Sequence, residues 1–140
     1  MKIIATHQDI YRDIQAEQLW RVWAVVNHLH QWDTDTEWSK LEGPFAAGST
    51  FRFKPKGGPT LCMRITEATP NRSFTDCFSL WTAKLYGIHV METIGADLQV
   101  TTHITVSGPG RWLMQKLLTE NIAKTIPEQT QQAIDLARQR

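Results

Sequence analysis

The sequence lacks the features that would place it at a membrane or on nucleic acid. No apolar run approaches the roughly 20 residues that a membrane-spanning helix needs. The N-terminal segment MKIIATHQDIYRDI is too polar for a secretory signal. The net charge is only +1 and the two signs are interspersed, whereas a nucleic-acid-binding surface normally carries a clustered basic face. We therefore expect a cytoplasmic protein with no membrane insertion and no nucleic-acid partner.

Cysteine is also scarce, and the common motifs for metals and cofactors are missing. The two cysteines, Cys62 and Cys77, should be reduced thiols in the cytoplasm, and a turn at Thr69-Pro70 would place them almost opposite each other. No CxxC or HxxxH spacing, P-loop, dinucleotide fingerprint or Ser-His-Asp order is present. The sequence therefore predicts no metal and no cofactor.

Two short charged segments are interpreted as solvated strand surface. Asp33, Asp35 and Glu37 alternate, but without a glycine-bearing loop they are a poor calcium site. The basic patch at residues 52–56 ends in a glycine turn, which favours a solvated strand face over a phosphate site.

The chain does have the composition and patterns of one folded domain covering residues 1–140. It has 140 residues and a hydrophobic fraction of 41%, enough to bury a core without disulfides. Helical spacing predicts helices at 16–26, at 28–32 (a short helix or turn) and over the last thirty residues, where Pro127 should cause a kink or a short break. Period-2 alternation and turn residues predict strands at 3–14, 33–41, 49–55, 60–68, 73–80, 84–93 and 98–107.

A seven-stranded antiparallel sheet has one face to bury, and one long helix can cover only part of it. The uncovered part must curl around side chains or around a cavity, and such cavities are common ligand sites. Four of the six tryptophans lie between Trp20 and Trp38. Trp20 and Trp23 are on the apolar stripe of the first helix and should pack in the core, while Trp32 and Trp38 are candidates for the cavity entrance.

The order of elements resembles the START/SRPBCC superfamily, and within it the polyketide cyclase/dehydrase-like proteins. The segments that carry the resemblance are residues 16–20, Trp32-Asp33, residues 41–49, residues 72–76, Gly87-Ile88-His89 and residues 106–109. The resemblance implies an α+β helix-grip fold: a seven-stranded antiparallel sheet wrapped around a long C-terminal helix, two short helices between strands 1 and 2, and a deep apolar cavity. Members bind lipids, sterols, polyketides, hormones and other apolar molecules, and a minority catalyse cyclisation or dehydration.

If that fold holds, the apolar member of each alternation should face the cavity. The predicted ligand-binding residues are Trp32, Trp38, Phe53, Met63, Phe78, His89, Met91, Ile104, Met114, Leu118 and Ile122. For any single apolar residue, a place in the plain core is the better interpretation. Met63, Met91 and Met114 favour binding slightly, because flexible thioethers suit adaptable surfaces.

Two polar residues share the faces of these apolar residues. Asp76 is in phase with Phe74 and Phe78, and His89 is in phase with Gly87 and Met91. They are the candidate catalytic residues, an acid/base pair for enolisation or water loss, or else the polar anchors of an apolar pocket. The alternative, a satisfied core histidine and a carboxylate at the rim of the sheet, stays open.

Three functions remain in competition. The favoured one is the binding of a small hydrophobic ligand, lipid-, polyketide- or aromatic-like, by a carrier or sensor. The second is a polyketide cyclase/dehydratase-type enzyme that uses Asp76 and His89. The third is an interaction module with a filled cavity. Monomer and homodimer are both left open.

Overall fold

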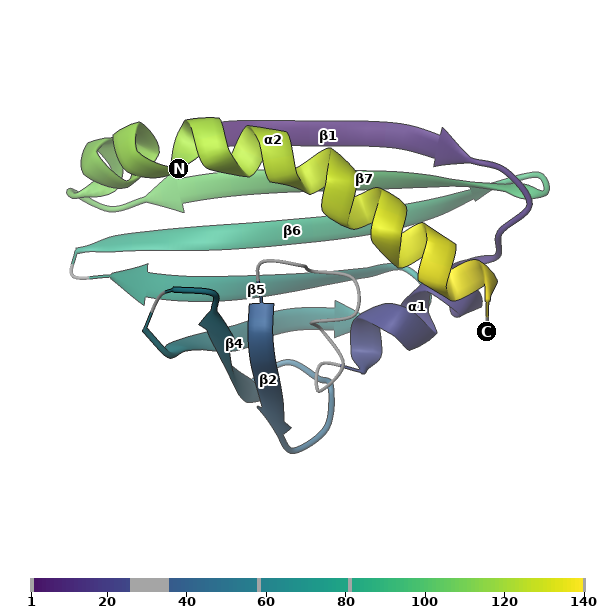
Figure 1. Ribbon diagram of the computed structural model, residues 1–140, viewed down its shortest axis with the longest axis horizontal. Helices are drawn as coiled ribbons and strands as arrows, with labels where there is room; N and C mark the ends of the chain where they lie inside the picture. Colours follow the sequence, from purple (N-terminus) through teal and green to yellow (C-terminus); the bar gives the residue numbers. More distant parts are fainter. Residues whose placement is uncertain (1, 26–35, 58, 81, 140) are drawn as a thin grey trace.

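The computed structural model describes residues 2–25, 36–57, 59–80 and 82–139. Within these residues the order of elements is one strand, one helix, six strands and one long helix (Figure 1). The bounds are β1 (Lys2–Tyr11), α1 (Ala16–Ala24), β2 (Thr36–Glu42), β3 (Thr50–Pro55), β4 (Leu61–Thr69), β5 (Ser73–Leu80), β6 (Ala83–Ile94), β7 (Asp97–Ser107) and α2 (Arg111–Arg138).

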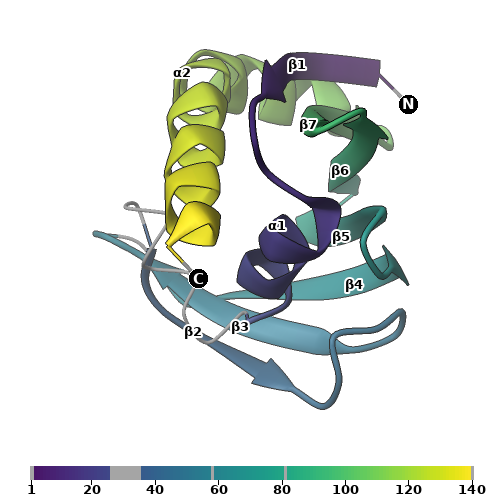
Figure 2. The same ribbon diagram turned by 90° about the vertical axis from the view of Figure 1, so that its right-hand side faces the viewer.

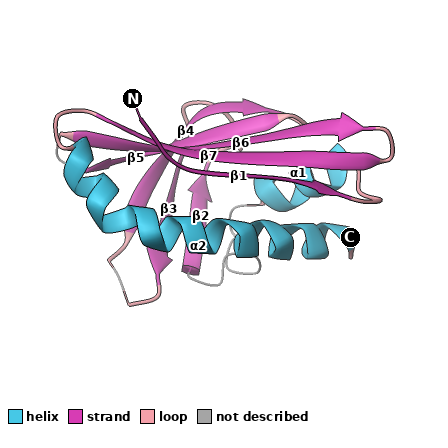
Figure 3. Cartoon of the chain, turned by 90° about the horizontal axis from the view of Figure 1, so that it is seen from above, coloured by secondary structure: helices cyan, strands magenta, loops and turns pink. Residues whose placement is uncertain are grey.

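The strands form one antiparallel sheet in the order β1-β7-β6-β5-β4-β3-β2. Figure 2 shows this sheet curling from β1 through β5 to β2, with α1 and α2 on its concave side. Figure 3 shows α2 lying along the sheet, with its C-terminal end beside α1. This arrangement confirms the predicted helix-grip architecture.

The predicted elements differ from the observed ones in a few places. The first helix is confirmed as α1, whereas the predicted helix or turn at 28–32 lies outside the described residues. The helix α2 continues without interruption through Pro127, so a break there is wrong. Pro127 removes only one backbone donor, and packing of the following residues against the sheet keeps the helix continuous.

We call the concave face, which α1 and α2 cover, the inner face of the sheet. It alternates along each strand with an outer face. Helix α2 contacts β1, β7 and β6, and α1 contacts both α2 and β6. The largest core cluster lies between these elements and includes Leu19, Val22 and Trp23 of α1, Val100 of β7 and Ile134 of α2. The C-terminal half of α2 is thereby fixed to the sheet by apolar burial.

Two further core clusters continue along the inner face. One joins Phe51 of β3 to Met63 and Ile65 of β4, and the other joins Ala83 of β6 to Val106 of β7. Phe78 packs against both clusters. The inner face is therefore lined by three apolar clusters that are connected through shared, partly buried neighbours.

The entry into α2 depends on one glycine. Gly108 has φ of +98°, in the left-handed region that favours glycine. A Cβ atom at this position would lie 2.0 Å from the carbonyl oxygen of Thr82. Only glycine allows the chain to turn this closely past the start of β6 and to begin α2 on the inner face.

The charged segments occupy the outer face and the edge of the sheet. Arg52 pairs with Glu42 at 3.4 Å, and Lys54 pairs with Glu37. The basic patch is therefore a solvated strand face with acidic partners on β2, as expected, while Asp33 and Asp35 lie outside the described residues.

The cysteines are close to the predicted arrangement. Both are free thiols, Cys62 exposed and Cys77 buried, and Cys77 pairs with Arg64, two residues along β4 from Cys62. Among the described residues, no helix is long and apolar enough to cross a membrane.

Candidate functional site

Asp76 and His89 meet on the inner face around Gly87. Asp76 of β5 pairs with Gly87 of β6, and His89 follows two residues later on the same face. A Cβ atom on Gly87 would lie 2.6 Å from Oδ1 of Asp76 and 3.2 Å from Nε2 of His89. The missing side chain of Gly87 thus lets two polar atoms approach one point above the sheet.

Aromatic rings hold the imidazole of His89 in place. Phe74 stacks on it with ring centroids 4.3 Å apart and an interplanar angle of 17°, and Trp23 of α1 lies 5.8 Å away. Nδ1 is 3.4 Å from the hydroxyl of Thr102, a buried residue of β7. The other ring nitrogen, Nε2, faces the point above Gly87.

The surroundings keep both side chains uncharged over a range of pH. Burial lowers the pKa of His89 to about 4, because the imidazolium would lose its hydration. Burial raises the pKa of Asp76 to about 7, and hydrogen bonds from the backbone N–H groups of Gly87 and of Asp76 itself oppose this only in part. Between these two values the site therefore contains a neutral carboxylic acid and a neutral imidazole.

The apolar candidates that the structure describes share the inner face with this pair. Ile65, Asp76, Gly87 and Ile104 pair successively across β4, β5, β6 and β7. Met63, Met91 and Ile104 are buried, and Phe53 and Phe78 are partly buried. The sequence pattern thus placed these residues on the correct face, although their contact with a ligand stays a prediction.

Other candidates lie elsewhere or outside the described part of the chain. Trp38 is 40% exposed and pairs with Lys54, so it is on the outer face of β2 and away from the other candidates. Trp32 lies outside the described residues. Met114, Leu118 and Ile122 belong to α2, but their side chains are outside the described residues.

Three residues at the site were not predicted from the sequence. Thr102 is in phase with Val100 and Ile104 on β7, and this phase was an available signal for its inward position. Phe45 in the β2–β3 connection packs against Phe74, with centroids 5.3 Å apart. Trp23 was expected in the core, and its contact with His89 depends on how α1 docks, which has no signal in the local sequence.

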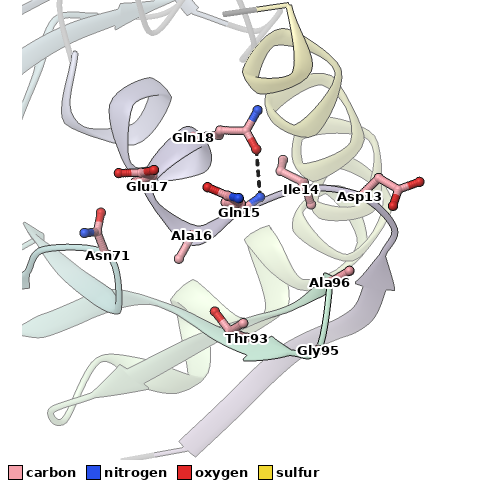
Figure 4. A pocket seen from close by; sticks show the side chains of 10 residues that line it. All are labelled: Asp13, Ile14, Gln15, Ala16, Glu17, Gln18, Asn71, Thr93, Gly95 and Ala96. Carbon is pink, nitrogen blue, oxygen red and sulfur yellow. Dashed lines mark hydrogen bonds between the residues drawn. The ribbon is translucent and has the colours of Figure 1, made fainter.

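A surface hollow of about 590 Å³ lies at one end of the sheet, apart from the predicted cavity. Figure 4 shows its lining side chains at the start of α1, in the β4–β5 turn and at the β6–β7 hairpin. The side chain of Gln18 accepts a hydrogen bond from the backbone N–H of Gln15 at 2.8 Å on its wall. None of the predicted site residues whose side chains are described lines it.

The described residues contain no group of three histidine, cysteine, aspartate or glutamate side chains that could hold a metal ion. The inner-face pair has only one carboxyl and one imidazole. A carboxyl group and an imidazole placed in this way can hydrogen-bond a ligand and transfer protons.

Solved structures share this fold over nearly the whole chain. Protein MLL2253 from Mesorhizobium loti matches with a TM-score of 0.74 and 13% identity, over 96% of this chain and 97% of that one. Ara h 8.0201 matches with a TM-score of 0.74 and 10% identity, over 96% and 98% of the two chains. The di-domain ARO/CYC protein BexL from the BE-7585A biosynthetic pathway matches with a TM-score of 0.71 and 14% identity, over 99% of this chain and 46% of BexL.

No protein-family model and no curated protein matches the sequence. At identities this low the structural likeness shows a common fold, and fold alone does not define function. The likeness confirms the helix-grip fold that the resemblance to the START/SRPBCC superfamily implied.

Proposed function

We propose that this protein binds a small, mostly apolar ligand on the inner face of its sheet and acts as a carrier or sensor in the cytoplasm. One observation carries the proposal: Asp76 and His89 approach a single point above Gly87 on a face that is otherwise largely apolar. The two side chains are the polar anchors of the ligand. The apolar residues around them supply the rest of its contacts.

The energetic cost of this pair supports a functional role. Removing an ionisable group from water is unfavourable unless it gains hydrogen bonds, and shifts of the pKa of Asp76 and His89 in opposite directions report that cost. Perturbed groups of this kind are frequent at functional sites, although structural networks also produce them. A ligand that hydrogen-bonds both side chains would offset the cost.

Binding of N-phenyl-1-naphthylamine, an uncharged apolar fluorophore, tests the proposal. Ile104→Trp would add bulk to the inner face, and Ile88→Trp would add the same bulk to the outer face of the neighbouring strand. We expect the wild type and the Ile88 variant to enhance the fluorescence of the probe, and the Ile104 variant to lose the enhancement. Circular dichroism would check that both variants fold. Equal enhancement by both, or none with the wild type, would contradict binding on the inner face.

The opposite pKa shifts also favour a second candidate, an enzyme of the cyclase/dehydratase type. Neutral His89 can accept a proton from a carbon next to a carbonyl, while protonated Asp76 donates to the carbonyl oxygen and an enol forms. Exchange of the α-protons of 2-tetralone in D₂O, followed by NMR, measures this step. Equal exchange rates with the wild type and His89→Gln would eliminate the enzyme hypothesis and leave ligand binding intact.

A further inference from the structure

The described basic side chains lie away from the inner face. The lysine and arginine side chains whose environment is described are exposed, except for Lys54, which is partly buried and pairs with Glu37. A ligand carboxylate near Gly87 would therefore meet the carboxyl group of Asp76 and no described cation. Desolvating an anion without a partner costs several kcal/mol or more.

The two atoms that face the point above Gly87 differ in their hydrogen-bonding ability. Oδ1 of Asp76 belongs to a carboxyl group, which donates one hydrogen bond when protonated and accepts others. Nε2 of His89 either donates or accepts, depending on the tautomer that the Thr102 contact selects. A ligand group that can both donate and accept would bind between them with either tautomer of His89.

We propose that the ligand carries an uncharged hydroxyl group, as in a phenol, an enol or an alcohol, and that this hydroxyl binds between Asp76 and His89 above Gly87. The inference rests on the proposed binding function and specifies its ligand class. A hydroxyl is small, donates one hydrogen bond and accepts others, so it fits either tautomer of His89. The raised pKa of Asp76 supports this assignment, because a neutral acid can donate to the hydroxyl oxygen.

The aromatic surroundings favour a ring next to that hydroxyl. Phe74 and Trp23 flank His89, and Phe45 continues the aromatic wall beyond Phe74. Aromatic pairs at such distances add stabilisation beyond their buried area. A planar hydroxylated ring therefore matches both the polar and the apolar parts of the site.

Three naphthalene probes of similar shape test the inference at about pH 6. There 2-naphthol is neutral, 2-naphthoate is ionised and 2-methylnaphthalene cannot hydrogen-bond. Quenching of tryptophan fluorescence would give the three dissociation constants. We expect 2-naphthol to bind about tenfold or more tightly than 2-methylnaphthalene, and 2-naphthoate to bind more weakly than either.

Two substitutions at Asp76 provide a matched pair. Asp76→Asn keeps a neutral group that donates and accepts, so it should retain the preference for 2-naphthol. Asp76→Leu keeps a similar volume without polar atoms. In this variant the dissociation constants of 2-naphthol and 2-methylnaphthalene should differ by less than about threefold.

The outcomes separate the ligand class from the binding function. Equal affinity of the wild type for the three probes, or tightest binding of 2-naphthoate, would overturn the hydroxyl assignment while preserving the proposed function. If 2-naphthylmethylamine, a cation at this pH, bound more tightly than 2-naphthol, the hydroxyl assignment would be overturned as well. Failure of every probe to bind would contradict both. If the leucine variant does not fold, the three wild-type affinities alone decide the assignment.

Discussion

Replacing Asp76 by asparagine and His89 by glutamine should change the pH dependence of folding stability with opposite signs. The pKa of Asp76 is about 7 in the folded protein against its usual 3.8, so in that window the folded state holds one proton more than the unfolded state. The contribution of Asp76 to the free energy of unfolding is fully present below pH 3.8, the pKa of the unfolded state. This contribution is lost as the pH rises through about 7. The free energy of unfolding therefore falls with rising pH because of this residue.

His89 acts in the other direction. Its pKa is about 4 in the folded protein against its usual 6.5, so in this window the folded state holds one proton fewer. Above pH 6.5, the pKa of the unfolded state, His89 is neutral in both states and does not lower the free energy of unfolding. As the pH falls from 6.5 towards about 4, His89 lowers the free energy of unfolding. The two contributions cancel in the wild type between about pH 4.5 and pH 6.5, where each has a slope of at most about 1.4 kcal/mol per pH unit.

When one of the two residues is replaced, the pH dependence of the free energy of unfolding that the other residue causes is no longer cancelled. Relative to the wild type, the free energy of unfolding of Asp76→Asn should rise with pH and that of His89→Gln should fall, each by about 1 to 2 kcal/mol over two pH units. These values are below the maximum slope, because both side chains remain partly in contact with solvent. The double variant should again parallel the wild type.

Urea unfolding followed by tryptophan fluorescence measures these differences at intervals between about pH 4.5 and pH 6.5. Glu92→Gln, which removes an exposed carboxylate from the strand that carries His89, serves as the control. The difference in the free energy of unfolding between each single variant and the wild type could change with pH in the same direction for both variants, or not change with pH at all. Either result would refute the assignment of neutral Asp76 and neutral His89.

Two further substitutions test the packing around the site by urea unfolding. Phe74→Ala should cost about 3 to 5 kcal/mol, because its ring packs between aromatic neighbours, whereas Trp38→Ala on the outer face should cost less than about 1 kcal/mol. Similar costs would contradict the assignment of the two faces. Gly108→Ala should cost about 3 kcal/mol or more, because its Cβ would meet the Thr82 carbonyl, while Gly95→Ala, also at positive φ but with no atom within 4 Å, should cost about 1 kcal/mol. A mild effect at Gly108 would contradict the close approach of the two backbones.

The period of the sequence was sufficient to place most of the site residues on the correct face. Asp76 alternates with Phe74 and Phe78, and His89 alternates with Met91, so any regular sheet would put both side chains inward. The same period also indicates the outward position of Trp38, because this residue is in phase with Lys40 and Glu42 and out of phase with Leu41. Its interpretation as a pocket residue was based on its aromatic ring and the neighbouring tryptophans.

The sequence by itself determined the order of elements, the antiparallel sheet, the long amphipathic helix and the inward phase of Asp76 and His89, because hydrophobic period and turn residues are local properties. Only the tertiary structure decided that these two side chains meet over Gly87 and that Trp23 comes from α1 to contact His89. Those contacts depend on the register between neighbouring strands, on the curl of the sheet and on the docking of a helix. All three arise from interactions between residues far apart in the chain, so the local sequence could not specify them.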